Sequence, residues 1–391
     1  MRRLLVATAI FGTGVSGAAA QDTTMVQGGI YQRPFLVGSG RTAVGGYAEA
    51  NTNYFATDGV GDGFSMEFRR FNIFLFSSVG RRIRFTSELE FEHGTEEIAL
   101  ETALVDFQVN PSFVLRAGIL LPPIGAFNVN HDGPRYDIID RPLVATEIIP
   151  ATLSEIGFGV HGRLAPRGFA ISYDAYLTNG LGDGIINNPS GRTRLADGKS
   201  EERFAEDNNG SPAISARVAA QARRYGEVGL SYYGGIYNRY RVEGVPVDEK
   251  RWLSIAALDL TTEIRGVELR GEVALATIDV PPSLRELMGS RQWGGYLDVV
   301  APVWRPTIRG LQRPVVSAVV RVERVDFNVG TFTSTDLPRG DDISAVTAGL
   351  SFRPAAGTVF RLGYRISRAR DLQGNDPART AGFQAGFATY F

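Results

Sequence analysis

The chain has 391 residues, of which 43% are hydrophobic and 21% charged, and it contains no cysteine. The lack of cysteine excludes disulfides, thiol nucleophiles and thiolate metal sites, and a formal net charge of −1 gives no reason to expect a nucleic-acid partner. Glycine (46 residues) and aromatic residues (10%) are abundant, but no stretch is apolar enough to form a transmembrane helix after the N-terminus. These features indicate a β-barrel with a polar interior and an apolar exterior.

The first twenty residues have the three parts of a secretory signal peptide. Arg2 and Arg3 form a positive region, residues 4–15 an apolar region, and the alanines at 18–20 a small-residue cleavage site. We therefore expect export and removal of residues 1–20, a periplasmic N-terminal segment over residues 21–43, and a barrel over residues 44–391.

Beyond residue 44 the apolar residues recur with a period of two, which is typical of β-strands. In RIRFTSELEFEH, Ile83, Phe85, Leu89 and Phe91 lie on one face. A soluble β-sandwich would show the same alternation. We expect sixteen strands, an even number as in single-chain bacterial outer-membrane barrels. Their ranges are 44–56, 63–77, 82–92, 97–109, 113–121, 155–164, 168–178, 212–222, 226–237, 251–263, 266–278, 291–302, 314–327, 342–353, 357–369 and 380–391.

The connections between these strands favour the membrane barrel over the sandwich. Short turns alternate with longer loops along the chain, as periplasmic turns and external loops do, with 303–313 as an exception. The last strand, TAGFQAGFATYF, ends on Phe391, and we expect it to pair with the first strand and to be the segment that the barrel-assembly machinery engages. Tryptophans at strand ends suit the aromatic girdles of a membrane barrel.

The two largest connections are 122–154 and 179–211, and we interpret 122–154 as a constriction loop. It breaks from a strand at Pro122-Pro123, and a structureless insertion of this length is usually a binding loop, lid or plug. Folded into a barrel, it would narrow the lumen. Its candidate constriction residues are Asn128, Asn130, His131, Asp132, Arg135, Asp137, Asp140 and Arg141.

Three segments resemble the phosphate-selective porin (O/P) family of bacterial outer-membrane β-barrels: EIALETALVDFQVNPSFVLRAGILLPPIGAFN, RPLVATEIIPATLSEIGFGVHGRL and the terminal strand. The resemblance covers roughly residues 44–391. It implies an all-β, sixteen-stranded transmembrane antiparallel barrel, a homotrimer, and an inward-folded third external loop, which is 122–154 by strand order. The chain departs from the family pattern because Ile119, Leu120 and Leu121 follow Gly118, and because 122–154 lacks lysine and has a formal charge of −2. We therefore do not carry over phosphate specificity.

The polar faces of the strands supply charges that we expect to line the pore. Opposite signs on facing strands would create a transverse field that orients polar solutes, although ion pairs that brace the wall are the alternative interpretation. The expected pore-lining charges are Arg82, Arg84, Glu88, Glu90, Arg163, Arg217, Glu268, Arg270, Glu272, Arg321, Arg361 and Arg365.

No pattern points to catalysis, a metal or a cofactor. The three histidines are His93, His131 and His161, and we interpret the adjacent His131 and Asp132 as a solvated loop pair because no nucleophile accompanies them. The spacing of residues 128, 130, 132 and 133 resembles the start of an EF-hand, but its twelfth position is Ile139 rather than a carboxylate.

The sequence thus predicts a bacterial outer-membrane porin that passes small hydrophilic solutes and ions passively. An anion- or phosphate-selective channel is the alternative, and a barrel hydrolase or a structural barrel is the alternative from another class. The expected partners are outer-membrane lipid, two further copies of the chain, the barrel-assembly machinery and small polar or anionic solutes.

Overall fold

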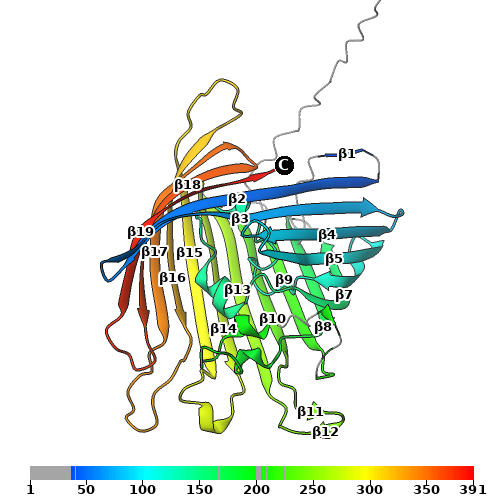
Figure 1. Ribbon diagram of the computed structural model, residues 1–391. Coiled ribbons are helices and arrows are strands. Elements are labelled where there is room, and N and C mark those ends of the chain that lie inside the picture. Colours follow the sequence, from blue (N-terminus) through cyan, green and yellow to red (C-terminus); the bar gives the residue numbers. More distant parts are fainter. Residues whose placement is uncertain are drawn as a thin grey trace, which may run out of the picture.

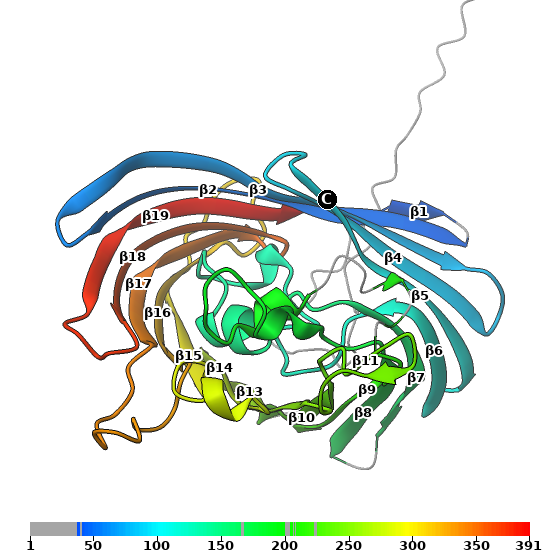
Figure 2. The same cartoon turned by 60° about the horizontal axis from the view of Figure 1, so that its bottom comes forward.

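The computed structural model describes residues 37–39, 41–165, 168–199, 204–205, 207, 209–222 and 225–391, so the expected signal peptide lies outside the described residues. Sixteen antiparallel strands close into one barrel (Figures 1 and 2). They are β2 (Thr42–Thr57), β3 (Val60–Ser78), β4 (Ile83–Glu92), β5 (Glu97–Asn110), β6 (Phe113–Leu120), β7 (Glu155–Leu164), β8 (Phe169–Thr178), β9 (Ala213–Ala222), β10 (Gly226–Ile236), β13 (Trp252–Ile264), β14 (Val267–Ile278), β15 (Arg291–Trp304), β16 (Val315–Asp326), β17 (Asp342–Ala355), β18 (Thr358–Arg370) and β19 (Ala378–Tyr390).

The predicted fold class is confirmed. Each expected strand overlaps one barrel strand, with ends that differ by no more than three residues. The short β1 (Val37–Ser39) pairs with β2, and the hairpin β11 (Arg241–Val242) and β12 (Val245–Pro246) forms a separate two-stranded sheet. These pieces were not predicted, because two or three residues are too few to show a period.

The barrel closes where the last strand meets the first. β19 pairs with β2 from Thr380 opposite Thr57 to Tyr390 opposite Tyr47. Beyond β19, Phe391 and Gly46 exchange two backbone hydrogen bonds of 3.0 and 3.1 Å. The expected pairing of the terminal strand is confirmed, and it leaves no free sheet edge at this seam.

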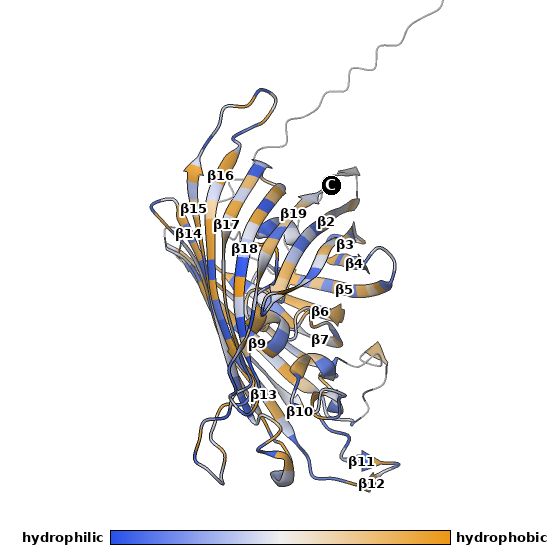
Figure 3. Cartoon of the chain, turned by 60° about the vertical axis from the view of Figure 1, so that its left-hand side comes forward, coloured by the Kyte–Doolittle hydropathy of each residue, from blue (hydrophilic) through white to orange (hydrophobic). Residues whose placement is uncertain are grey.

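Alternation along the strands gives the barrel an apolar outer face. On β14, Val273 and Leu275 are exposed, whereas Glu272 and Ala274 between them are buried inside the barrel. Apolar and polar segments alternate along the other strands in the same way (Figure 3). None of the helices among the described residues is long and apolar enough to cross a membrane.

The connections sort by length between the two ends of the barrel. The connections 237–251, 279–290 and 327–341 lie at one end (Figure 1, bottom), and 121–154 and the described part of 179–212 leave from strands at that same end and fold inward. The other end has tight turns such as 111–112 and 356–357, together with the longer connection 305–314. This is the parity that the sequence predicts, including its one exception.

The interior differs from the expected polar lumen, because an apolar core lies inside the barrel. Residues of the connections 121–154 and 179–212 pack on the inner face of β10, β13 and β14. Tyr233, Leu253, Ile255, Ile148 and Ile185 are each no more than 1% exposed there. The reason is local: the stretch of β13 from Trp252 is apolar on both faces, so its inner face needs an apolar cover.

Candidate pore constriction

The connection between β6 and β7, residues 121–154, lies within the barrel outline in Figure 2, and none of its residues is exposed. It contains a 3-10 turn, Gly133–Arg135, and a π-helical turn, Val144–Ile148. The segment is therefore folded, which corrects the expectation of a structureless insertion. We call residues 121–154 the constriction segment.

One buried asparagine joins the two ends of the constriction segment. The Asn128 Nδ2 donates to the carbonyl oxygens of Pro122 (2.8 Å) and Leu153 (3.1 Å), and its Oδ1 accepts from the Leu153 N–H at 2.8 Å. The side chain thus satisfies backbone groups that neither β6 nor β7 can pair. Asn128, predicted as a lumen residue, instead holds the base of the segment.

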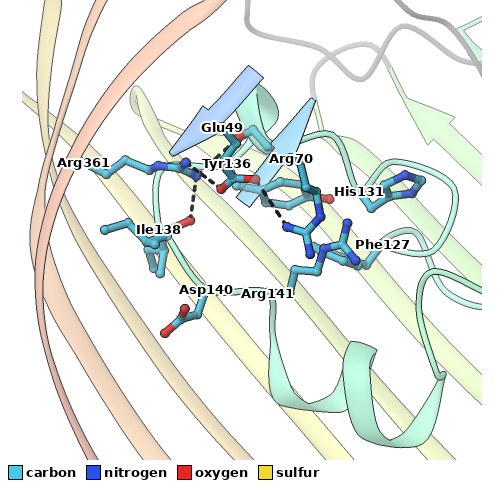
Figure 4. A pocket seen from close by; sticks show the side chains of 11 residues that line it. Glu49, Arg70, Phe127, His131, Tyr136, Ile138, Asp140, Arg141 and Arg361 are labelled. Atoms are coloured by element: carbon cyan, nitrogen blue, oxygen red, sulfur yellow. Dashed lines mark hydrogen bonds and ion pairs between the residues drawn. The ribbon is translucent and has the colours of Figure 1, made fainter. Parts of the chain in front are cut away.

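Arginines of the barrel wall bind the carboxylates and carbonyls of the segment. Arg353 on β17 forms a two-pronged ion pair with Asp137, at 2.9 and 3.1 Å, and donates to the Pro134 carbonyl at 2.8 Å. Arg361 on β18 donates to the Ile138 carbonyl at 3.2 Å and to Glu49 of β2 at 2.8 Å (Figure 4). Such planar, two-pronged contacts suit the guanidinium group.

Asp140 is held from four strands. Its backbone carbonyl accepts from Arg321 on β16 at 2.6 Å. Its carboxylate accepts from Arg365 on β18 (3.2 Å) and Gln384 on β19 (2.6 Å), and lies 3.5 Å from the Arg69 guanidinium of β3. Asp140 therefore fixes this part of the segment against the wall.

Glutamates of the wall bind the segment through its N–H groups. The Glu272 Oε2 accepts from the N–H groups of Ala126 (2.9 Å) and Phe127 (3.1 Å), and the Glu323 Oε2 accepts from the Leu143 N–H at 2.8 Å. Acidic wall residues thus bind N–H groups of the segment, and basic wall residues bind its carbonyl and carboxylate groups. Wall charges that were predicted to act on solutes therefore contact the segment instead.

His131 and Asp132 are buried rather than solvated, which corrects the sequence interpretation of this pair. His131 is 1% exposed and contacts Glu101 of β5, and Asp132 is fully buried and accepts from the Tyr390 hydroxyl of β19 at 2.8 Å. Neighbouring Arg135 lies 3.5 Å from the Asp132 carboxylate. The two neighbouring side chains therefore contact different strands of the wall, β5 and β19.

The remaining predicted residues have separate places. Asn130 donates to the Ala126 carbonyl within the segment at 3.0 Å. Arg82 lies in the turn before β4 and not on the strand, because β4 begins one residue later. Arg270 pairs with Glu268 on the same strand. Arg84, Glu88 and Glu90 lie on β4, with Arg84 exposed and both glutamates buried, and Arg163 on β7 is exposed.

Arg217 braces the wall, which is the alternative raised for these charges. Its guanidinium on β9 contacts the Asp259 carboxylate of β13 at 2.7 and 3.1 Å and Glu227 of β10 at 3.0 Å. Arg321 likewise pairs with Asp298 of β15 at 2.6 and 2.7 Å.

A small cavity of about 10 Å³ remains between the segment and the wall (Figure 4). Arg70, Arg361 and Arg141 line it with Glu49 and Tyr136. The Arg141 Nε and Nη2 atoms are buried and have no hydrogen-bond partner among the described residues.

Two carboxyl groups of the segment have shifted pKa values. Burial alone would raise the pKa of Asp137, but the Arg353 guanidinium holds it below its ordinary value. Burial raises the pKa of Glu147, and Arg194 at 3.9 Å only partly opposes that effect.

Sequence reasoning missed Glu49, Arg70 and Arg353. The signal for Arg353 was present, because it continues the inward face of β17 two residues after the buried Ser351. Glu49 and Arg70 lie beside register shifts in the β2–β3 pairing, where counting by twos fails.

Comparison with known proteins gives a fold and no family. No family model matches the chain. An uncharacterized protein of Aquifex aeolicus is 26% identical over 363 residues, which cover 87% of this chain and 78% of that protein.

Several solved structures resemble the barrel, among them the following two. The anion-selective porin from Comamonas acidovorans superposes with a TM-score of 0.56 and 12% identity, covering 90% of this chain and 99% of that one. The trimer form of in-vitro folded OmpT, an outer membrane protein of Vibrio cholerae, gives 0.53 and 11%, covering 90% and 100%. The chain therefore has the sixteen-stranded barrel fold of outer-membrane porins.

Proposed function

We propose that the protein is an outer-membrane porin that lets small hydrophilic solutes and ions diffuse passively, with the constriction segment as its narrowest part. The observation that carries this proposal is the segment itself: no residue of 121–154 is exposed, and charged side chains from six strands, β3, β5, β14, β16, β17 and β18, contact it inside a closed barrel. An apolar outer face is what a barrel in lipid needs.

The same proposal places the protein in the bacterial outer membrane. Residues 1–20 act as the signal peptide, residues 21–43 as a periplasmic segment and residues 44–391 as the barrel. The strand ending at Phe391 engages the assembly machinery, and the mature form is a homotrimer. The trimer form named for the similar Vibrio cholerae protein supports this last point.

Weak ion selectivity follows from the pairing of the wall charges. Arg321, Arg353, Arg361 and Arg365 each contact a carboxylate, so little of their charge is left to act on a passing ion. An anion-selective channel, including a member of the phosphate-selective family, is the second candidate. The partnerless guanidinium nitrogens of Arg141 favour it, as does the anion selectivity named for the Comamonas porin.

A barrel hydrolase has less support. His93, His131 and His161 each contact a carboxylate, at 2.8, 3.0 and 3.5 Å. A base ready to activate a nucleophile would also contact a hydroxyl group, and within the described residues none of these imidazoles does.

Planar-bilayer recording of the purified protein tests the proposal. We expect stepwise conductance, and a reversal potential near zero in a salt gradient. Deleting residues 128–141 removes the tethers at Asp137 and Asp140 and should raise the single-channel conductance. Shortening 305–314 at the other end of the barrel is the matched control and should not.

The outcomes are separable. A protein that inserts but shows no conductance steps would rule out a porin. Conductance that the deletion leaves unchanged would show that the segment does not limit flow. A strongly anionic reversal potential would favour the second candidate.

A further inference from the structure

Three buried side chains with metal-binding groups meet where the constriction segment touches the wall. Glu88 comes from β4, Glu101 from β5 and His131 from the segment, and one ligand atom of each lies within 4.8 Å of the others. Their exposed fractions are 0%, 3% and 1%. Buried carboxylates at this spacing repel one another unless a proton or cation lies between them.

The hydrogen bonds of His131 leave one ring nitrogen facing a carboxylate. The Nδ1 atom lies 2.9 Å from the Asn128 carbonyl oxygen, which can only accept, so Nδ1 carries a proton. The Nε2 atom then faces the Glu101 Oε2 at 3.0 Å. In a neutral imidazole both of these atoms are acceptors, and something positive must lie between them. An Nδ1–H group held by a carbonyl is also how metal-binding histidines are oriented.

A second, independent observation comes from Tyr47 of β2. Its side chain is fully buried, and its hydroxyl group has no hydrogen-bond partner among the described residues. Tyr47 pairs across the β2–β3 ladder with Asn72, whose Nδ2 donates to the Glu88 carboxylate at 2.7 Å, so Tyr47 lies beside the same cluster. A buried hydroxyl without a partner is costly, and a hydrated ion in the cluster would satisfy it.

The local charges do not balance. Four guanidinium groups act on five carboxylates, which leaves an excess of one negative charge. The carboxylates are those of Glu49, Glu88, Glu90, Glu92 and Glu101, and the guanidinium groups those of Arg69, Arg70, Arg141 and Arg361. The neighbours Asn72 and Thr152 donate neutral hydrogen bonds of 2.7 Å to Glu88 and Glu101. A bound cation would offset this excess.

We propose that Glu88, Glu101 and His131 bind one divalent transition-metal ion of the Zn²⁺ type, which clamps the constriction segment to β4 and β5. An imidazole nitrogen with two carboxylate oxygens suits Zn²⁺ better than the harder Mg²⁺ or Ca²⁺, which prefer oxygen ligands alone. Three protein ligands leave a fourth position for water. The clamp extends the sequence analysis, which took His131 and Glu88 as lumen residues and expected no metal.

The test measures metal binding, so it is independent of whether the barrel conducts. Folded protein is stripped with EDTA, titrated with ZnCl₂, desalted and assayed for zinc by mass spectrometry. Co²⁺ in place of Zn²⁺ reports ligand geometry through its visible absorption. We expect about one tightly held Zn²⁺ per chain, and at least a roughly tenfold loss of affinity in His131→Gln and Glu101→Gln.

His93→Gln is the matched control, because His93 also contacts a glutamate but its side chain is 48% exposed beside Glu67. It should bind zinc as the wild type does. Heat-modifiable gel migration checks that each variant is folded. If one of the variants does not fold, the nearly isosteric Glu88→Gln is tested in its place. The proposal would be overturned if the titrated wild-type protein retained no zinc, or if His131→Gln bound zinc as tightly as the wild type. The positive charge between His131 Nε2 and Glu101 Oε2 would then be a proton.

Discussion

The ion pair between Arg353 and Asp137 offers the sharpest test of how the constriction segment is held. We consider Arg353→Met, which keeps much of the side-chain volume and removes the guanidinium group. The variant loses two contacts to the Asp137 carboxylate, at 2.9 and 3.1 Å, and one of 2.8 Å to the Pro134 carbonyl. The carboxylate, whose side chain is 7% exposed, is then left in the barrel without its partner.

Leaving one member of a buried pair unpaired costs about 3 kcal/mol. That loss corresponds to a factor of roughly 150 in the ratio of docked to released segment. Further tethers at Asp140 and Glu272 keep the segment docked for most of the time. We therefore expect brief openings to a larger conductance in Arg353→Met, and not a permanently wider channel.

Single-channel recording at fixed voltage measures the fraction of time spent in the larger state. Arg309→Met removes an exposed arginine of the connection 305–314 and should leave the trace unchanged. Adding Asp137→Leu to Arg353→Met removes the unpaired charge and should lower the open fraction again. This account of the tether would be refuted if Arg353→Met showed no openings to the larger conductance. It would also be refuted if the double variant spent more time in the larger state than either single variant, Arg353→Met or Asp137→Leu.

Three further results are expected. The pKa of Asp137 is lowered in the folded protein. Its ion pair with Arg353 is therefore complete above the ordinary carboxyl pKa of about 4 and is lost as the pH falls through the lowered pKa. Conductance fluctuations should therefore appear only in acid. Gly118→Ala should lower the yield of folded barrel, because a φ of +124° is unfavourable for alanine and the new Cβ would lie 2.2 Å from the Ala103 carbonyl oxygen. Gly363→Ala is the control and should fold normally, because the nearest atom to its new Cβ would be 3.5 Å away. Deleting Phe391 removes the two backbone bonds to Gly46 at the end of the β19–β2 seam, so heat-modifiable migration should reveal slower assembly than in the wild type.

The barrel could be predicted from the sequence because its signals are local and repeated. A period of two is visible within one strand, as in Ile83 to Phe91, and the lengths of successive connections reveal which end each occupies. The sixteen strands could be predicted without knowing which strands are neighbours. Every barrel strand except those at the seam pairs with the next barrel strand in the chain.

The contents of the barrel could not be predicted in the same way. The wall partners of the segment are 30 to 258 residues away in sequence, from Glu101 with His131 to Tyr390 with Asp132. Composition does not encode which wall residue a loop carbonyl will meet. The apolar inner face of β13 was a readable signal that something covers it, since a wet lumen gives no reason for leucine and isoleucine on both faces.

The pairing of charges also changes what the formal charge of the constriction segment means. Counted from sequence, the segment is acidic and would favour cations. In the barrel, Asp137 and Asp140 contact Arg353 and Arg365, so the field of each carboxylate is largely cancelled within a few ångströms, well inside a Debye length of about 8 Å. A passing ion therefore meets dipoles and not two net charges. The channel should therefore select only weakly between cations and anions, and the size of the opening should decide which solutes pass.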